Sequence, residues 1–141
     1  MNEILEKLKD DEHYYGEFGK QYLSNSDIIT LLNDPKSFRK DKIVTKPMLI
    51  GRYFHTAMLE PDKLVSEEFI SIDVTSRNSK KYKEEILEYG RLLMMLDKEK
   101  VEINKAISLM KNNLEFFEDI YDDDNEFEVP AVQEVMGMMW K

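Results

Sequence analysis

The stretch Lys46–Pro61, KPMLIGRYFHTAMLEP, predicts a single amphipathic helix that carries a glycine four residues before a histidine. Pro47 suits the first turn of this helix, where the missing N–H of proline is no loss, and Pro61 ends it. Because side chains on a helix lean toward its N-terminus, the imidazole of His55 is expected over the turn that contains Gly51. Glycine inside a helix lowers its stability by roughly 1 kcal/mol relative to alanine, so we expect Gly51 to have a structural or functional role.

Two interpretations of this pair are open at the level of the sequence. In the first, His55 is a core or boundary residue, and Gly51 allows another helix to pack closely. In the second, the open turn at Gly51 holds a metal ion, a water molecule or a phosphate, and His55 is a ligand, a role that histidine often takes in proteins.

Composition and charge place the chain among acidic globular proteins. It has 141 residues, enough for one domain (1–141) with a real core, and a hydrophobic fraction of 42%. Its net charge of −9 argues against a general nucleic-acid coat protein, and its lack of cysteine excludes disulfides, zinc–thiolate sites and cysteine nucleophiles. No signal peptide or membrane-spanning run is recognisable, so we expect a cytoplasmic protein with no membrane partner.

Basic residues gather in two segments, 36–46 and 77–83, although the chain as a whole is acidic. Such segments contact phosphate in nucleic-acid-binding proteins, but they also form ordinary solvated loops and helix faces, and both interpretations stay open. Arg77 and Lys80 are the candidates for phosphate contact in the second segment. Arg52, in the predicted histidine helix, is a weaker candidate.

The remaining segments predict a mainly helical chain whose β-structure lies toward its C-terminus. Ser24, followed three residues later by Asp27, resembles a capping box at the start of a helix. Gly137 interrupts one predicted strand, and a further strand follows it. Helices are expected over 2–12, 24–33, 79–90 and 97–119, and strands over 67–74 and 127–136.

Four short motifs occur in a definite order. Leu23-Ser24-Asn25-Ser26 opens a helix, Asp34-Pro35 follows its end, and Gly51-x-x-x-His55 precedes Leu59-Glu60-Pro61. This combination resembles the N-terminal half of the RecE-type (exodeoxyribonuclease VIII-like) phage exonucleases of the PD-(D/E)XK superfamily, over residues 20–141. The resemblance implies an α/β fold, mainly α in this segment, that comprises the helical N-terminal half of the nuclease and the first strands of its central sheet.

The resemblance also implies a function, namely a hydrolase that digests linear double-stranded DNA for phage recombination, in the cytoplasm of a phage-infected or prophage-bearing bacterium. Enzymes of this kind use Mg²⁺ or Mn²⁺, can form homo-oligomeric rings around DNA, and are expected to work with a single-strand annealing protein. By resemblance, His55 is the expected metal ligand and Glu134 a weaker one. Arg77, Lys80 and, more weakly, Arg52 are the expected DNA contacts.

The catalytic Asp and the Glu-x-Lys of that family, expected after Gly137, are absent from this chain. An apolar end such as Met138–Lys141 is unusual for a domain, so we expect a nuclease fold cut in half and a chain that is inactive alone. A non-catalytic alternative stays open: a helical DNA-binding or protein-binding module derived from a split or decayed nuclease.

Overall fold

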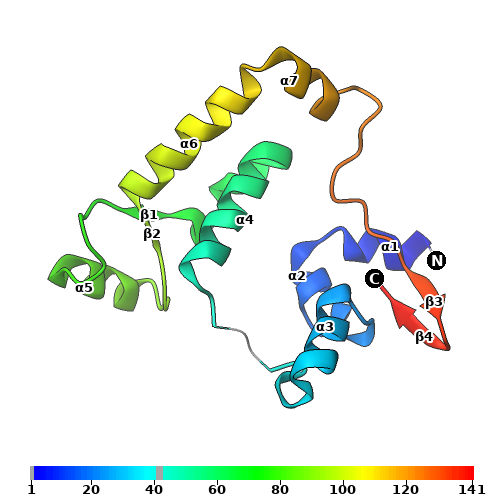
Figure 1. Cartoon of the computed structure of the whole chain (residues 1–141). Helices are drawn as coiled ribbons and strands as arrows, with labels where there is room; N and C mark the ends of the chain where they lie inside the picture. Colours follow the sequence, from blue (N-terminus) through cyan, green and yellow to red (C-terminus); the bar gives the residue numbers. More distant parts are fainter. Residues whose placement is uncertain (1, 41–42) are drawn as a thin grey trace. The chain divides into compact units, whose positions relative to one another are not determined.

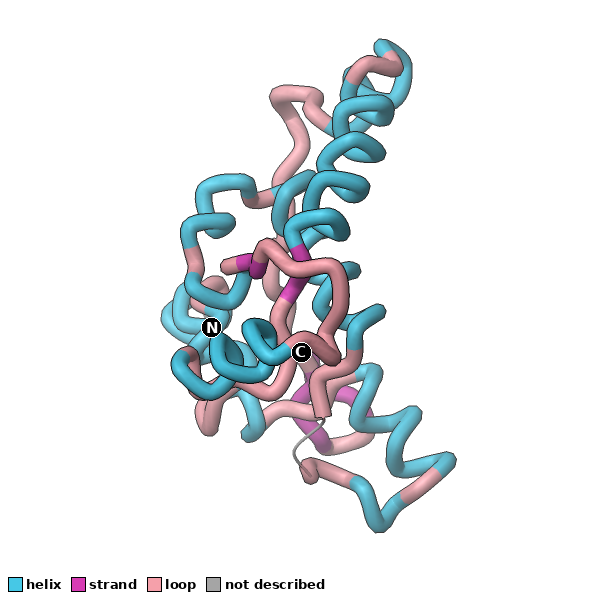
Figure 2. Tube along the Cα trace, turned by 90° about the vertical axis from the view of Figure 1, so that its left-hand side faces the viewer, coloured by secondary structure: helices cyan, strands magenta, loops and turns pink. Residues whose placement is uncertain are grey.

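A computed structural model describes residues 2–40 and 43–141, and in these residues helix predominates over strand (Figure 1; Figure 2). The contacts divide the chain into two compact units. Unit 1 comprises Met1–Lys42 and Glu128–Lys141, and unit 2 comprises Ile43–Phe127. The strands in the described residues form two small sheets of two strands each, which is compatible with an α/β class.

In its described residues, 2–40 and 128–141, unit 1 contains three helices, two short 3₁₀ segments and one antiparallel hairpin. The predicted helix over 2–12 is divided, because the side chain of Asp10 accepts a hydrogen bond from the N–H of His13 and starts a new helix there. The elements of unit 1 are α1 (Asn2–Leu8), α2 (Asp11–Tyr15), η1 (Gly19–Gln21), α3 (Asn25–Asn33), η2 (Pro35–Ser37), β3 (Gln133–Val135) and β4 (Met138–Trp140).

The start of α3 confirms the predicted capping box. The hydroxyl of Ser24 accepts a hydrogen bond from the N–H of Asp27, and the carboxylate of Asp27 accepts one from the N–H of Ser24 at 2.9 Å. Two of the helix's otherwise unpaired N-terminal donors are thereby satisfied. The helix ends at Asn33, two residues before Pro35, as the sequence predicts.

The predicted strand over 127–136 keeps only Gln133–Val135 as strand, whereas the predicted second strand forms as Met138–Trp140 and pairs with Leu23. Met136 and Gly137 both have positive φ, 53° and 77°, as in the two-residue turns that suit the twist of a hairpin. Leu23 donates its N–H to the carbonyl of Met139 at 2.9 Å and accepts the N–H of Lys141 at 2.8 Å. The two ends of the sequence are therefore joined within unit 1.

Unit 2 is built around two long helices, with two short strands that pair in parallel, Ser71 beside Met95 and Ile72 beside Leu96 (Figure 1). Its α-helices and strands are α4 (Lys46–Leu59), β1 (Ser71–Ile72), α5 (Lys80–Glu88), β2 (Met95–Leu96), α6 (Asp97–Lys111) and α7 (Leu114–Ile120). The 3₁₀ segments η3 (Pro61–Val65) and η4 (Glu67–Phe69) connect α4 to β1.

Two predicted elements of unit 2 are shorter than expected. The predicted strand over 67–74 keeps only Ser71–Ile72 as strand, because the hydroxyl of Ser66 accepts the N–H of Glu68 and begins a 3₁₀ turn. The predicted helix over 97–119 divides into α6 and α7, because the side chain of Asn113 accepts the N–H of Phe116 and caps a second helix.

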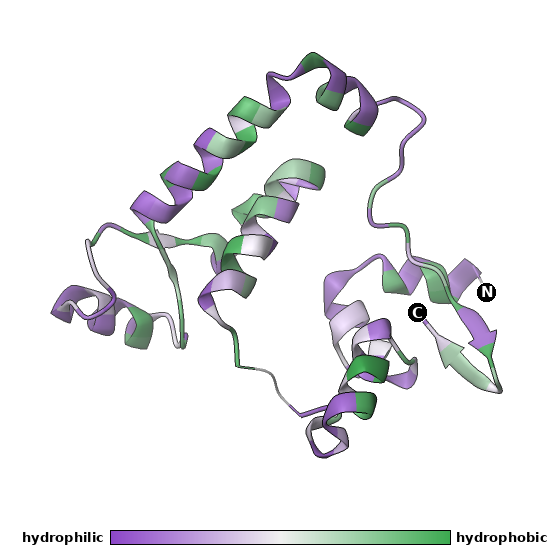
Figure 3. Ribbon diagram, in the orientation of Figure 1, coloured by the Kyte–Doolittle hydropathy of each residue, from purple (hydrophilic) through white to green (hydrophobic). Residues whose placement is uncertain are grey.

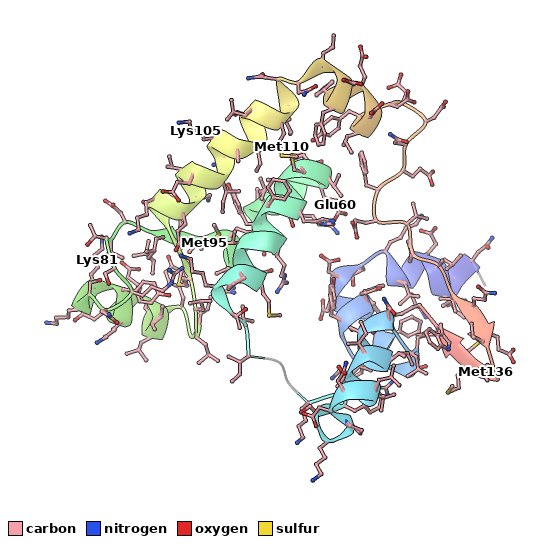
Figure 4. The ribbon with its side chains drawn as sticks, viewed as in Figure 1. Glu60, Lys81, Met95, Lys105, Met110 and Met136 are labelled. Carbon is pink, nitrogen blue, oxygen red and sulfur yellow. The ribbon has the colours of Figure 1, made fainter. Side chains whose placement is uncertain are left out.

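The core of unit 2 lies where α4, α6 and the two short strands meet. Met95 of β2 is completely buried and belongs to one cluster with Leu49, Tyr53 and Phe69 (Figure 4). The hydroxyl of Tyr53 on α4 donates to Asn104 on α6 at 2.8 Å. Hydrophilic and hydrophobic residues alternate along α6, as expected for a helix with one packed side (Figure 3). Among residues 2–40 and 43–141, no helix is long and apolar enough to cross a membrane.

Candidate functional site

The structure places His55 on the solvent-exposed side of α4. The buried side of this helix consists of Leu49, Tyr53, Ala57 and Met58. Phe54 and Leu59 are half-buried and pack against the same core. This exposed stripe of α4 consists of Met48, Gly51, Arg52 and His55.

Packing within the described residues gives no reason for the glycine in this stripe. A Cβ atom added to Gly51 would meet no heavy atom within 4 Å in the described part of the chain. The interpretation that Gly51 permits close helix packing is therefore wrong for the described structure. Of the two positions that the first interpretation allows for His55, core or boundary, its exposure contradicts the core. What remains is an exposed imidazole one turn after an open position on the same side of the helix.

We expect Gly51→Ala to stabilise the chain by about 1 kcal/mol, because alanine has the higher helix propensity and its methyl group has free space. Urea denaturation at neutral pH measures the difference. Gly90→Ala is the matched control: Gly90 has a φ of +61°, a conformation that alanine adopts poorly, so that variant should be less stable than wild type. A destabilised Gly51→Ala variant would show that the glycine has a packing role after all.

Arg52, which precedes His55 by one turn, is held by an ion pair. Its two terminal nitrogens lie 2.7 and 2.9 Å from the two carboxylate oxygens of Glu68 in η4. The Arg52 side chain is 52% exposed, so this pair is at the surface and contributes little to stability. A DNA phosphate that contacted Arg52 would have to compete with Glu68.

Arg77 is occupied by a buried carboxylate. Its two terminal nitrogens donate to the two oxygens of Glu99 at 2.7 and 2.6 Å, and one of them also donates to the carbonyl of Met94 at 3.1 Å. The side chain of Arg77 is 23% exposed and that of Glu99 only 7%. The geometry gives Arg77 a structural partner, and its role as a DNA contact stays a prediction.

Glu99 is a residue that the motif analysis missed. Besides Arg77, its carboxylate contacts the ammonium of Lys46 at 2.8 Å and accepts the N–H of Leu96 at 3.0 Å. It thereby joins the start of α4, the end of β2 and the loop before α5. One sequence signal was present, since a glutamate at the third helical position is typical of a capping box.

The same contacts explain the acidity of Glu99. Burial removes water from the carboxylate and by itself would raise the pKa, but the hydrogen bonds from Arg77, Lys46 and the Leu96 N–H outweigh this effect and lower it to about 2. Glu99 is therefore a permanently ionised structural group at neutral pH rather than a proton donor or acceptor.

Lys80 and Glu134 both lie at the surface. Lys80 begins α5, with its side chain 90% exposed and its ammonium 3.6 Å from Glu84. Such a pair leaves most of the ammonium's donors to solvent or to a ligand. Glu134 is an exposed residue of β3 in unit 1, whereas His55 belongs to unit 2.

The residues present do not by themselves fit a divalent metal ion. Within residues 2–40 and 43–141, no group of three or more His, Asp or Glu side chains is arranged to hold one. Mg²⁺ requires several oxygen ligands in octahedral geometry, which a single imidazole cannot supply. A metal at His55 would therefore need carboxylates other than those that the described structure gathers.

Comparisons with known proteins identify no relative. No family model, no curated protein and no solved structure matches this chain.

Proposed function

We propose that this chain is the histidine-bearing helical part of a metal-dependent exonuclease that digests linear double-stranded DNA. One observation carries the proposal: the exposed side of α4 presents His55 beside Gly51, and packing within the described residues does not require that glycine. Functional sites often keep residues that lower stability, so a helical glycine without a packing role indicates such a site.

Within this proposal, His55 would supply one ligand to Mg²⁺ or Mn²⁺, and the Asp and Glu-x-Lys carboxylates that the resemblance implies, which this chain lacks, would supply the others. Glu134 is an accessory acid, and Lys80 is the better placed of the proposed DNA contacts because Arg77 and Arg52 already bind carboxylates. A bound metal ion would activate water and stabilise charge on the scissile phosphate. The PD-(D/E)XK fold, a ring-shaped homo-oligomer, an annealing-protein partner and a location in the bacterial cytoplasm belong to the same proposal.

The decisive experiment compares His55→Ala with wild type in a protein extended through the polypeptide encoded immediately downstream. We expect Mg²⁺-dependent digestion of linear duplex DNA by the wild type and a loss of at least about 100-fold in the variant, because a missing first metal ligand costs more than the 10- to 100-fold typical of an outer-shell residue. The midpoint of unfolding should not change, since His55 is exposed.

His13→Ala is the matched control, because His13 is the other histidine of the chain and is also exposed. It should keep full activity. Wild-type activity in His55→Ala would reject the metal-ligand role, and an extended protein without nuclease activity would reject the exonuclease proposal itself. The 141-residue chain alone should show no Mg²⁺-dependent digestion.

A non-catalytic binding module is the second candidate, and the exposed apolar side chains of α6 and α7 favour it. Val101 is 66% exposed, Leu109 is 65% exposed and Leu114 is 70% exposed. Exposed apolar groups of this size are common at surfaces that bind other proteins. Native mass spectrometry of the purified chain separates the candidates: a stable complex of defined composition, without nuclease activity in the extended protein, supports the module.

A further inference from the structure

Unit 1 contains an open groove of about 660 Å³ that neither the histidine helix nor the resemblance accounts for. Its walls come from α2, η1, the start of α3, the residues after η2 and the end of the chain. The pairing of Leu23 with β4 brings these distant segments together. The lining residues that carry the argument are Tyr14, Tyr15, Ser26, Arg39, Lys40 and Lys141.

The groove is basic in an acidic protein. Three of its lining residues, Arg39, Lys40 and Lys141, are basic against one acidic residue, Asp27, whereas the whole chain has a net charge of −9. A fourth basic residue, Lys20, is ion-paired with Glu17 at 2.7 Å. The carboxylate of Asp27 already accepts hydrogen bonds from the N–H and the hydroxyl of Ser24. A concave surface with an excess of one charge attracts ligands of the opposite charge, so the groove favours an anion.

Lys141 is held in place at one end of the groove. Its ammonium lies 4.0 Å from the centre of the Tyr14 ring and donates to the Tyr14 carbonyl. Burial lowers the pKa of Lys141; the nearby charge of Asp27 opposes this, and that of Arg39 adds to it. Two cations that repel one another across a groove would both be stabilised by an anion between them.

The backbone of Arg39 has a conformation that is rare for residues other than glycine. Its φ is 56°, in the left-handed region, and its guanidinium lies 4.9 Å from the centre of the Phe38 ring. Such conformations are unfavourable for residues other than glycine and are concentrated at functional sites. The exposed Lys40 follows directly.

Neutral donors of α3 face the same space. Ser26 and Asn25 occupy the first turn of this nine-residue helix and line the groove. The first N–H groups of a helix have no intrahelical partner, and they favour anions together with the helix dipole. The hydroxyl of Ser26 donates to that of Ser24 at 3.0 Å, because the Ser24 proton goes to Asp27, so the donors that α3 offers a ligand are backbone N–H groups.

Exposed aromatic rings indicate the kind of anion. Tyr15 is 70% exposed, and its ring packs edge-to-face on Tyr14 with the centres 5.0 Å apart. An inorganic anion has no aromatic or apolar surface that could stack on the exposed ring of Tyr15. A strand of nucleic acid has such a surface, because its bases stack on aromatic rings while its phosphates follow a basic groove.

We propose that this groove binds a single strand of nucleic acid, with its phosphates at Arg39, Lys40 and Lys141 and a base stacked on Tyr15. All the residues of this groove belong to unit 1, and binding of a strand there does not require a metal at His55. Such binding is therefore equally compatible with a nuclease and with a non-catalytic module.

The test is fluorescence anisotropy of a short labelled oligothymidylate titrated with the 141-residue chain. We expect saturable binding, and three phosphate contacts should give a slope of about −2 for the logarithm of the binding constant against the logarithm of salt concentration, at about 0.7 per contact. Inorganic phosphate should compete only weakly, because it lacks the base.

Three variants test the residues separately. Arg39→Gly and Lys40→Ala should each reduce the salt slope by about 0.7. Tyr15→Ala should weaken binding by about tenfold and leave the slope unchanged, because stacking on an aromatic ring does not displace counterions. Arg39→Gly should unfold at the same temperature as wild type or a higher one, because glycine adopts the left-handed conformation readily. Its loss of binding therefore cannot be attributed to misfolding.

Lys105→Ala is the matched control, since Lys105 lies on the side of α6 away from α4 in unit 2 (Figure 4). It should bind like wild type. The proposal is overturned by an absence of saturable binding, by equal affinity in wild type and the three variants, or by a polyglutamate peptide that binds as tightly as the oligonucleotide. If the strand binds but only Lys80→Ala weakens it, the groove proposal fails while the exonuclease proposal survives.

Discussion

Glu99→Gln is expected to lower the free energy of unfolding of this chain by about 3 kcal/mol. Removing one partner of a buried ion pair typically costs about 3–5 kcal/mol, because it leaves the other charge desolvated and unpaired. The lower end applies here, since the side chain of Arg77 is still 23% exposed and that of Lys46 is 54% exposed. Urea denaturation at pH 7 measures the loss.

The cost should also depend on pH in a defined direction. The folded-state pKa of Glu99 is about 2 against an ordinary value of 4.5, so ionisation of this group stabilises the folded state. This contribution is fully present above about pH 4.5 and declines as the pH falls toward about 2. The difference between wild type and Glu99→Gln should therefore shrink over that interval.

Glu102→Gln is the matched control, because Glu102 is an exposed residue of α6. That variant should differ from wild type by less than about 0.5 kcal/mol at every pH. If Glu99→Gln proved as stable as wild type at pH 7, the contacts with Arg77 and Lys46 would not stabilise the fold. Arg77 would then be a stronger candidate for a DNA contact.

Tyr82→Phe is expected to lower the free energy of unfolding by about 1–3 kcal/mol, the second-largest effect on stability. The Tyr82 hydroxyl accepts the N–H of Met94 at 2.9 Å and donates to its carbonyl at 3.1 Å, in place of a neighbouring strand. Tyr82 is 3% exposed and Met94 is completely buried. Phenylalanine would leave the buried Met94 N–H unpaired, at about 1–3 kcal/mol, whereas the Met94 carbonyl would keep its hydrogen bond from Arg77.

Tyr89→Phe removes the same hydroxyl from a residue that is 42% exposed and should change the stability by less than about 0.5 kcal/mol. Hydrogen exchange adds a second readout, because the Met94 amide should lose protection selectively in Tyr82→Phe. Equal stability of both variants would mean that water replaces the lost hydroxyl and that the site is less enclosed than its burial indicates.

The elements that the sequence predicts correctly depend on local interactions. The histidine helix is bounded by Pro47 and Pro61, and the capping box of α3 requires only Ser24 and Asp27. The second strand of the hairpin follows a turn at Gly137. In each case residues within a few positions of one another supply the donors, acceptors and backbone angles, so the element can be predicted without knowledge of the fold.

The elements that the sequence predicts poorly depend on distant partners. The strand over 67–74 is limited to Ser71–Ile72, because the 3₁₀ turn at Glu67–Phe69 precedes it and only these two residues pair with Met95–Leu96. The pairing of Glu99 with Arg77 spans 22 positions, and no periodic pattern indicates it. The fold of the PD-(D/E)XK superfamily, as the resemblance implies it, stays a proposal.

For the candidate site, the residues alone specify that His55 lies one turn after Gly51 on the same side of a helix, because helix geometry follows from local backbone conformation. Only the tertiary structure decides that this side is exposed, that Arg77 is occupied by Glu99, and that Lys141 and Arg39 face one groove. Burial and long-range pairing are properties of the packed chain, and residues far apart in sequence acquire them together.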